Sequence, residues 1–216
     1  MKKTSAGIFY ETRFMINELS TGAATVVIPT KNGTFGVSVF DFGYSLYKEN
    51  KYGLSFGKSF SENFSAGIQM DYLTTKISDN YGNKNVLAAE IGIQTEPIKN
   101  FTVGAHVFNP TRTRIASYND ERVPTIMRLG FDYKFSEKVF VAAEIEKDID
   151  RKGNIKAGLE YCPATQFYLR AGIATNPSLS CLGIGIKLKR FQLDISSSLH
   201  SVLGISSQIG LSYEFE

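Results

Sequence analysis

Residues 64–72 read Phe-Ser-Ala-Gly-Ile-Gln-Met-Asp-Tyr, with an apolar side chain at every second position. Side chains on a β-strand point to opposite faces in turn, so this stretch builds one apolar face and one polar face. Residues 87–93 and 182–188 repeat the pattern with Gly, Glu and Lys on the second face. Many such segments of about ten residues, separated by turn residues, are the signature of a transmembrane β-barrel.

The alternation predicts an all-β protein, a single antiparallel transmembrane β-barrel of about fourteen strands spanning residues 1–216. An even count is usual for bacterial single-chain barrels, and most expected strands reach the roughly nine to eleven residues needed to cross a bilayer. The expected strands are 5–13, 22–29, 34–47, 51–60, 64–77, 85–96, 101–109, 124–135, 138–148, 154–162, 166–175, 180–189, 191–199 and 204–215.

The predicted connections alternate in length along the chain. One set is tight, as at 30–33 and 61–63, and the other is generally longer, with 110–123 the longest and 48–50 short for its class. Short periplasmic turns opposite longer external loops are typical of an outer-membrane barrel. We therefore expect both termini on the periplasmic side.

The third expected strand changes phase. Phe35 and Val37 share one face, whereas Phe40 and Phe42 share the other. One extra residue near Phe40 would restore the alternation, which predicts a β-bulge there. Two shorter strands separated by a bend are the alternative.

Composition excludes several classes of protein. No run of 18 apolar residues exists, which excludes a helical membrane span. The net charge of +3 comes from scattered residues, so we expect no nucleic-acid partner. Cys162 and Cys181 fit no zinc spacing, and we expect neither a metal nor a cofactor. They could pair in an oxidising compartment, although two unpaired small residues near strand ends are the favoured interpretation.

Aromatic residues are expected to mark the membrane boundaries. The chain has no Trp, and six Tyr fall on the face that we predict to point outward: Tyr10, Tyr52, Tyr72, Tyr133, Tyr161 and Tyr213. A lipid-facing aromatic belt is the favoured interpretation, and cross-strand packing on a soluble sheet is the alternative. The last strand ends on Phe215, the kind of terminal aromatic that barrel assembly factors recognise, although Glu216 follows it.

Two segments carry a family resemblance. Residues 109–112 read Asn-Pro-Thr-Arg, and residues 118–136 read Tyr-Asn-Asp-Glu-Arg-Val-Pro-Thr-Ile-Met-Arg-Leu-Gly-Phe-Asp-Tyr-Lys-Phe-Ser. With them, essentially the whole chain resembles outer-membrane proteins of Bacteroidetes that are similar to the outer-membrane shuttle component of type IX secretion. More distantly, it resembles the long-chain fatty-acid transporter family. The resemblance implies a fourteen-strand barrel in the bacterial outer membrane, with an N-terminal plug that carries an Asn-Pro-Ala-like motif.

The first residues fit that expectation only in part. Residues 1–3 read Met-Lys-Lys, like the opening of a signal peptide, but no apolar core of seven residues follows. No segment precedes the first expected strand that could form the plug. We therefore expect an N-terminally truncated chain that lacks its export signal and plug.

The polar face of the strands carries charges of both signs. The predicted lumen network comprises Asp71, Glu90, Arg128, Asp132, Glu144, Lys156, Glu160, Arg170 and Lys187. Charges in a low dielectric must be paired, so the favoured interpretation is a neutralised network that holds the barrel wall. A substrate track is the sharper alternative.

The longest expected loop is a candidate recognition site, because exposed loops often carry recognition. Its charged residues are Arg112, Arg114, Asp120, Glu121 and Arg122. A solvated turn made rigid by internal ion pairs is the favoured alternative.

No enzyme is predicted. Ser198 and His200 share a strand face, the kind of pair that a membrane-embedded esterase would use. By phase both point into the lumen, and no acidic partner can be placed beside them. The esterase therefore stays a remote alternative.

The sequence favours a transport- or secretion-associated barrel, either a gated conduit for a small hydrophobic compound or a scaffold for a secreted protein. A structural or adhesive surface barrel without a conduit is the alternative. The expected partners are outer-membrane lipid, the barrel assembly machinery during biogenesis, and such a compound or secreted cargo.

Overall fold

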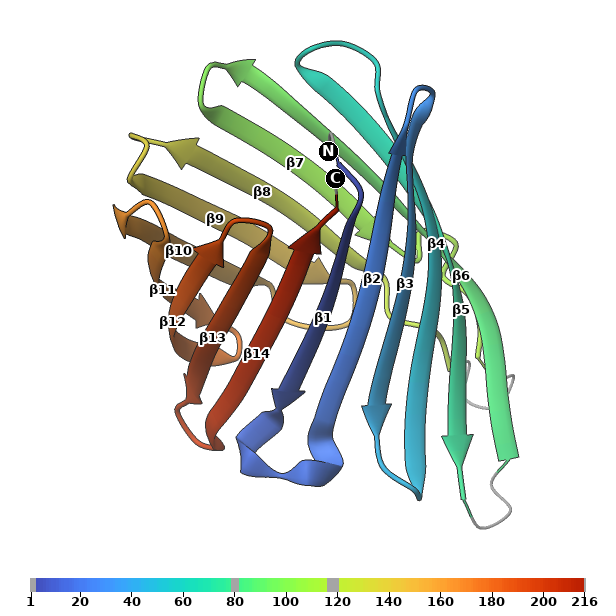
Figure 1. Cartoon of the computed structure of the whole chain (residues 1–216). Helices are drawn as coiled ribbons and strands as arrows, with labels where there is room; N and C mark the ends of the chain where they lie inside the picture. The colour runs from blue at the N-terminus through green and yellow to red at the C-terminus, as the bar shows by residue number, and fades with distance from the viewer. Residues whose placement is uncertain (1–2, 79–81, 116–120, 216) are drawn as a thin grey trace.

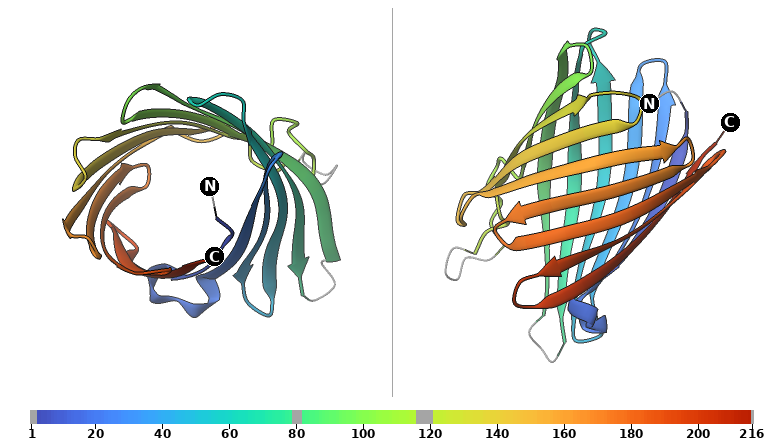
Figure 2. Two further views of the ribbon diagram at one scale, coloured as in Figure 1. Left: turned by 45° about the horizontal axis from the view of Figure 1, so that its top comes forward. Right: turned by 90° about the vertical axis from the view of Figure 1, so that its left-hand side faces the viewer.

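The described residues of the computed structural model, 3–78, 82–115 and 121–215, form a closed β-barrel of fourteen antiparallel strands. Each strand pairs with the next along the chain, and β1 pairs with β14 to close the cylinder (Figures 1 and 2). Both chain ends lie at the same end of the barrel (Figure 1). The predicted fold class is confirmed.

The strands are close to those expected from the sequence. They are β1 (Ser5–Thr12), β2 (Ser20–Thr30), β3 (Gly33–Gly43), β4 (Tyr47–Ser59), β5 (Phe64–Ile77), β6 (Gly82–Ile98), β7 (Phe101–Phe108), β8 (Ile126–Lys134), β9 (Val139–Asp148), β10 (Asn154–Ala164), β11 (Phe167–Thr175), β12 (Ser178–Leu188), β13 (Phe191–His200) and β14 (Gly204–Glu214). Two short 3₁₀ helices, η1 (Arg13–Met15) and η2 (Asn17–Leu19), connect β1 to β2. Among the described residues, no helix has the length and apolar character needed to cross a membrane.

The predicted alternation of connection length is confirmed in part, because the connections 44–46 and 176–177 of the longer set are also short. Those on the side of the chain ends are tight, whereas the opposite end carries η1, η2 and the segment 109–125 between β7 and β8. We call these the turn end and the loop end of the barrel. The turn end is at the top of Figure 1.

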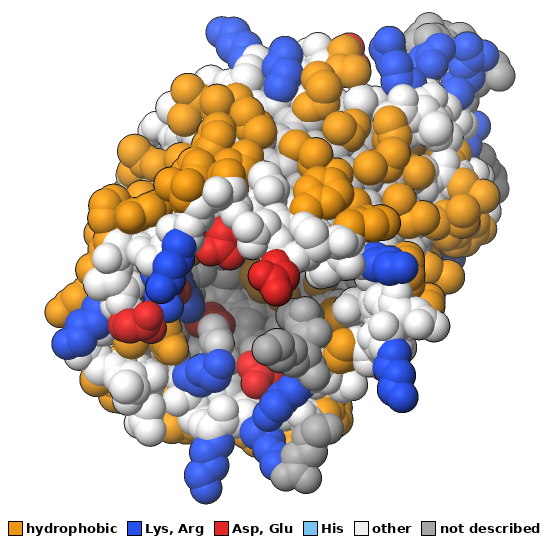
Figure 3. Space-filling model, turned by 90° about the horizontal axis from the view of Figure 1, so that it is seen from above, with side chains coloured by type: hydrophobic (Ala, Val, Ile, Leu, Met, Phe, Trp, Pro, Cys, Tyr) orange, Lys and Arg blue, Asp and Glu red, His pale blue; other side chains and the backbone are white. Residues whose placement is uncertain are grey.

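The outer wall is apolar. Leu54, Ile68 and Leu182 expose 65%, 62% and 71% of their surface. Exposure on this scale in water would forfeit about 25 cal/mol for every Å² of apolar area left unburied, whereas hydrocarbon accepts it without that loss. Seen from the turn end, apolar side chains cover the outside, and charged side chains gather around the mouth (Figure 3).

Aromatic rings form two levels on the outer wall. At the turn end the rings of Phe35 and Phe56 lie 4.9 Å apart, and those of Phe60 and Phe64 lie 6.1 Å apart. Toward the loop end the rings of Tyr52 and Tyr72 lie 6.5 Å apart. Phe60 directly follows the last residue of β4 and stands eight residues after Tyr52. At about 3.4 Å per residue and a tilt of about 40°, the two levels enclose a band roughly 21 Å tall, close to the apolar band of membrane barrels.

The remaining predicted outward tyrosines also lie on this wall. Tyr10, Tyr133 and Tyr161 are exposed there. Tyr213 is half-buried between the rings of Phe191 and Phe215, 4.6 Å and 4.9 Å away. The terminal aromatic strand therefore takes part in the turn-end level.

The β-bulge predicted near Phe40 is wrong, and so is the alternative of a bend. Strand β3 keeps one register with both β2 and β4 along its whole length. Phe40 and Phe42 therefore face the lumen, while Phe35 and Val37 face outward. Both faces of this strand are apolar near the loop end, which is why the alternation looked broken.

The turn before β4 also differs from the expectation. It occupies residues 44–46, whereas the predicted connection, 48–50, belongs to β4. Gly43 adopts φ 103°, a conformation that favours glycine, and the Tyr44 N–H donates to the Tyr47 carbonyl oxygen at 2.8 Å. Glycine thus ends the strand earlier than the run of aromatic residues indicated.

We expect Leu182→Arg to destabilise the membrane-inserted barrel by about 2–4 kcal/mol, because it puts a charge at mid-height on the lipid-facing wall. Thr74→Arg, beyond the Tyr52–Tyr72 level, should cost at most about 1 kcal/mol. Reversible unfolding from lipid vesicles in urea measures both values. Equal costs for the two variants would show that the apolar band is misplaced.

Candidate functional site in the lumen

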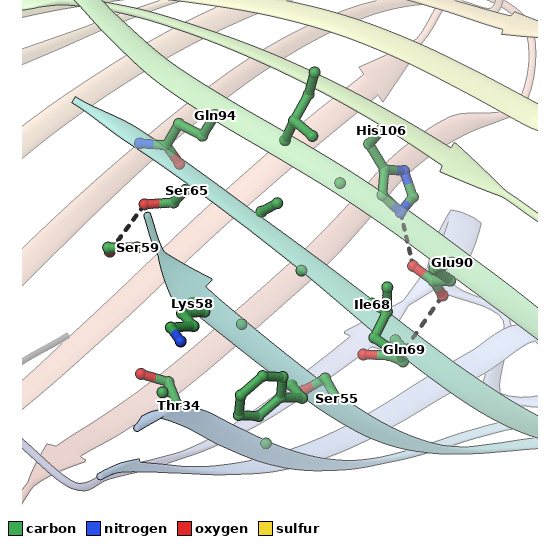
Figure 4. Close-up of a pocket in the computed structure, with 18 of the residues that line it drawn as sticks. Thr34, Ser55, Lys58, Ser59, Ser65, Ile68, Gln69, Glu90, Gln94 and His106 are labelled. Atoms are coloured by element: carbon green, nitrogen blue, oxygen red, sulfur yellow. Dashed lines mark hydrogen bonds and ion pairs between the residues drawn. The ribbon is translucent and has the colours of Figure 1, made fainter. Parts of the chain in front are cut away.

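A cavity with a volume of about 970 Å³ lies inside the barrel. It extends along the wall from β2 to β9. Hydroxyl and amide side chains line part of it, among them Thr34, Ser55, Ser65 and Gln94 (Figure 4). Glu90, His106 and Arg128 also line this cavity.

Glycines form much of the cavity wall. Gly67 on β5 stands directly opposite Gly57 on β4 and Gly92 on β6. Gly104 and Gly130 face each other on β7 and β8. Because these residues carry no side chain, the inner wall lies close to the backbone and leaves the bore open.

Glu90 is the centre of the first charged cluster. Its Oε1 accepts hydrogen bonds from the Lys51 Nζ at 2.9 Å and the Gln69 Nε2 at 3.3 Å. Its Oε2 lies 2.8 Å from the His106 Nε2. Side chains from β4, β5 and β7 therefore converge on one carboxylate of β6. Figure 4 shows the contacts of Glu90 with Gln69 and His106.

Asp71 is fully buried beside this cluster. Its Oδ1 accepts a hydrogen bond from the Gln69 Nε2 at 2.8 Å, and within the described ranges its Oδ2 has no partner. Gly53 makes room for both groups, because a Cβ there would lie 2.8 Å from the Gln69 amide nitrogen and 2.9 Å from the Asp71 Oδ1.

A second cluster joins β8, β9 and β10. The Glu146 Oε2 accepts from the Arg128 Nε at 2.7 Å and from the Lys156 Nζ at 3.0 Å. Lys156 also donates to the Glu144 Oε1 at 2.9 Å. Two cations and two carboxylates thus neutralise one another along the wall.

A third cluster spans four strands. The Arg170 Nε donates to the Glu160 Oε2 at 2.6 Å, and its Nη1 donates to Asp194. Arg170 is on β11 and Asp194 on β13, so this contact crosses β12. It crosses at Gly185, where a Cβ would lie 2.5 Å from the Asp194 Oδ1 and 3.0 Å from the Arg170 Nη1.

The other predicted lumen residues also lie on the inner wall. Lys187 forms an ion pair with Glu214, with 3.5 Å between the Nζ and the Oε1. Asp132 lines a second inner cavity of about 460 Å³, together with Glu144 and Lys156. The structure thus brings the nine predicted residues into several separate groups. Whether they guide a solute stays a prediction.

The sequence set omitted Lys51 and gave His106 no role, although both bind Glu90. Lys51 stood at the first position of an expected strand, beside a predicted loop. The sequence did contain a signal for Lys51: it is two residues from Gly53 and four from Ser55, and residues two apart on a strand share a face, so all three belong to the polar inner face.

An apolar patch lies on the inner wall at the loop end, beside the Glu90 cluster. Phe40, Lys51, Leu73 and Val86 stand opposite one another in a row across β3 to β6. The Lys51 ammonium lies 5.5 Å from the centre of the Phe108 ring, within cation–π range. Phe108 and Ile126, opposite each other on β7 and β8, continue the patch.

The segment 109–125 folds around Asn109, which is fully buried. The Asn109 Nδ2 donates to the Val123 carbonyl oxygen at 2.8 Å, and its Oδ1 accepts from the Thr113 N–H at 3.1 Å. The Thr125 hydroxyl donates to the Asn109 carbonyl oxygen at 2.9 Å. This asparagine therefore holds the two ends of the loop together.

The candidate recognition residues lie on this loop. Arg114 and Arg122 form an isolated β-bridge, and the Arg122 Nη1 donates to the Arg112 carbonyl oxygen at 3.1 Å. The Glu121 carbonyl oxygen accepts from the Ile115 N–H at 2.8 Å. Asp120 lies outside the described residues. Backbone hydrogen bonds thus organise the hairpin, and its role in recognition stays a prediction.

Ser198 and His200 face inward, as their phase predicted. Ser198 is buried, and the His200 Nδ1 accepts hydrogen bonds from the N–H groups of Val202 and Leu203 at 3.1 Å and 3.2 Å. The ring of His200 packs edge-on against Phe14, 5.9 Å away. The histidine therefore organises a turn. Cys162 and Cys181 are free thiols in the structure.

Known proteins resemble this chain in fold and not in sequence. No family model matches the sequence, and no curated protein sequence matches it significantly. The CymD monoaromatic hydrocarbon channel aligns at a TM-score of 0.72 and 12% identity, covering 100% of this chain and 89% of that chain. A Pseudomonas aeruginosa FadL homologue aligns at 0.70 and 11%, covering 100% and 91%. The KdgM porin aligns at 0.55 and 13%, covering 98% and 99%.

These likenesses give the chain the fold of bacterial outer-membrane channels and porins, which supports an outer-membrane location. The matched proteins are channels and porins and not enzymes. The predicted relation to Bacteroidetes proteins and to type IX secretion is not among these findings, and it stays a prediction.

We expect Gly185→Ala to destabilise the barrel by about 1–3 kcal/mol, because the added methyl group separates Arg170 from Asp194 and leaves both half-buried charges without this ion pair. Gly158→Ala is the matched control, because its Cβ would meet only the Ala171 carbonyl oxygen at 3.6 Å, an ordinary contact. Urea unfolding in detergent measures the difference. Equal stabilities would mean that the ion pair across β12 contributes nothing.

We expect Asn109→Ala to open the 109–125 loop, since it leaves the Val123 carbonyl oxygen and the Thr113 N–H without their partner. Trypsin should then cleave after Arg114 or Arg122 at least about tenfold faster, as expected for a loss of about 1.4 kcal/mol. Asn32→Ala, in a tight turn, serves as the control. Unchanged cleavage in Asn109→Ala would contradict the role of this side chain.

Proposed function

We propose that the protein is an outer-membrane channel that admits small, largely apolar compounds at its loop end. The observation that carries the proposal is the apolar patch on the inner wall, formed by Phe40, Leu73, Val86, Phe108 and Ile126. Apolar side chains that face a bore have no lipid to contact, so they favour an apolar solute. The channel fold described above supports transport in general.

The rest of the lumen suits passage more than tight binding. Beyond the patch, the basic side chains Lys51, Arg128, Lys156 and Arg170 each lie within 3.0 Å of a carboxylate oxygen, which weakens the field of each cation at the centre of the bore. The glycine wall then leaves a cavity of about 970 Å³, large enough for a small organic molecule. A solute would leave the apolar patch beside Glu90 and enter this wider space.

The Phe108→Ser variant tests this function. Because the CymD channel is described as a monoaromatic hydrocarbon channel, toluene is the probe. We expect the initial uptake of radiolabelled toluene by Gram-negative cells expressing the protein to fall about fivefold, which corresponds to the loss of about 1 kcal/mol of contact.

Phe135→Ser is the control, because Phe135 is exposed in the turn-end aromatic level of the outer wall. Uptake that is the same in both variants and in cells without the protein would refute the proposal. Passage of only polar solutes through planar bilayers would favour a general porin instead. A scaffold for secreted cargo stays a prediction, which loss of surface cargo after gene deletion would favour.

A further inference from the structure

Strand β6 is longer than the strand that follows it. It pairs with β5 from Gly82 onward, but its pairing with β7 begins only at Glu90, opposite Phe108. In the part of the chain that the structure describes, residues 82–88 therefore have a strand partner on one side only. The other side is an open β-edge.

The backbone geometry shows which groups this edge presents. The Ala89 carbonyl oxygen accepts a hydrogen bond from the Asn109 N–H at 2.8 Å, so the backbone N–H and C=O groups of Ala89 point toward the β7 side of the strand. The backbone groups of successive residues point to opposite sides of a strand, so those of every second residue point to the same side. The N–H and C=O groups of Asn83, Asn85 and Leu87 therefore point to the same side as those of Ala89. No hydrogen bond from a described residue reaches them.

The chain itself turns away from this edge. Asn109 adopts φ 51° at the end of β7, and Pro110, which follows it, has no N–H to offer β6. The Asn109 side chain then ties the loop to Val123 and Thr125, at the start of β8. As far as the described residues go, these local features of the sequence leave the edge open.

The edge also lies beyond the apolar band. Leu87 stands opposite Tyr72, which belongs to the loop-end aromatic level, and residues 82–86 extend further. On these outer faces Lys48 stands opposite Lys76, and Lys76 opposite Asn83. In hydrocarbon an open edge would cost several kcal/mol for each unpaired group. Here it projects past the band, where β5 and β6 reach further than β12 to β14 (Figure 1).

We propose that this β6 edge, residues 83–87, binds an extended acidic peptide segment of a partner protein by β-strand addition. An exposed edge offers main-chain hydrogen bonds to any extended chain, and its neighbouring side chains select the sequence. Lys76 on the outer face and Lys84 on the inner face are both exposed beside it. Acidic side chains on an added strand would meet a lysine on either face. This docking requires no solute in the lumen.

The test uses a fluorescent peptide of alternating glutamate and valine, titrated against the full chain in nanodiscs and followed by anisotropy. Asn85→Pro removes one N–H of the open edge and leaves the β5–β6 ladder intact, because that ladder uses the groups of Lys84 and Val86. We expect binding to weaken about tenfold in Asn85→Pro and to stay unchanged in Asn85→Ala. The same peptide N-methylated at alternate residues should not bind the native chain.

Several outcomes would overturn the proposal. The first is that the native chain does not bind the peptide, and the second is that it binds the N-methylated peptide equally well. A lysine–valine peptide of equal affinity would refute the preference for acidic partners. Dimers of the chain that Asn85→Pro abolishes would assign the edge to a second copy. If Asn85→Pro fails to fold, judged by its heat-dependent shift on a gel, the N-methylated peptide still decides.

Discussion

The constraint on which this structure depends is the pairing of backbone groups in surroundings without water. An N–H or C=O left open in hydrocarbon costs several kcal/mol, so a sheet that crosses a membrane must close on itself. In the described residues β1 meets β14, and the fourteen strands leave no edge within the apolar band. Because the backbone groups are paired, the outer side chains can be apolar and the inner side chains can be polar.

The same closure explains the chemistry of the lumen. Inward charges lie between the bore and a low-dielectric wall, where an unpaired charge is expensive. Glu90, Glu146 and Arg170 each bind two or more partners from other strands of the barrel. Inward glycines such as Gly53 and Gly185 provide the room for these contacts. Small residues and ion pairs are thus two parts of one arrangement.

Much of the fold could be predicted from the sequence, because period-two alternation reports directly on which side chains face lipid. The prediction failed where another requirement overrode that pattern. At Phe40 an apolar lumen patch hid the alternation, and at Gly43 a positive φ ended the strand early. The charged residues of the lumen could be recognised by their phase. Their partners could not, because the contact of Arg170 with Asp194 across β12 depends on the register of three strands.

The glycine wall has a consequence for how such a protein can diversify. Gly57, Gly67, Gly92, Gly104 and Gly130 hold no cross-strand charge, so the barrel does not rely on them for its ion pairs. Each lines the large inner cavity without a side chain of its own. Adding one methyl group or one ring there would trim the calibre locally while the scaffold stays the same. The width of the bore could therefore be changed by single substitutions at these glycines.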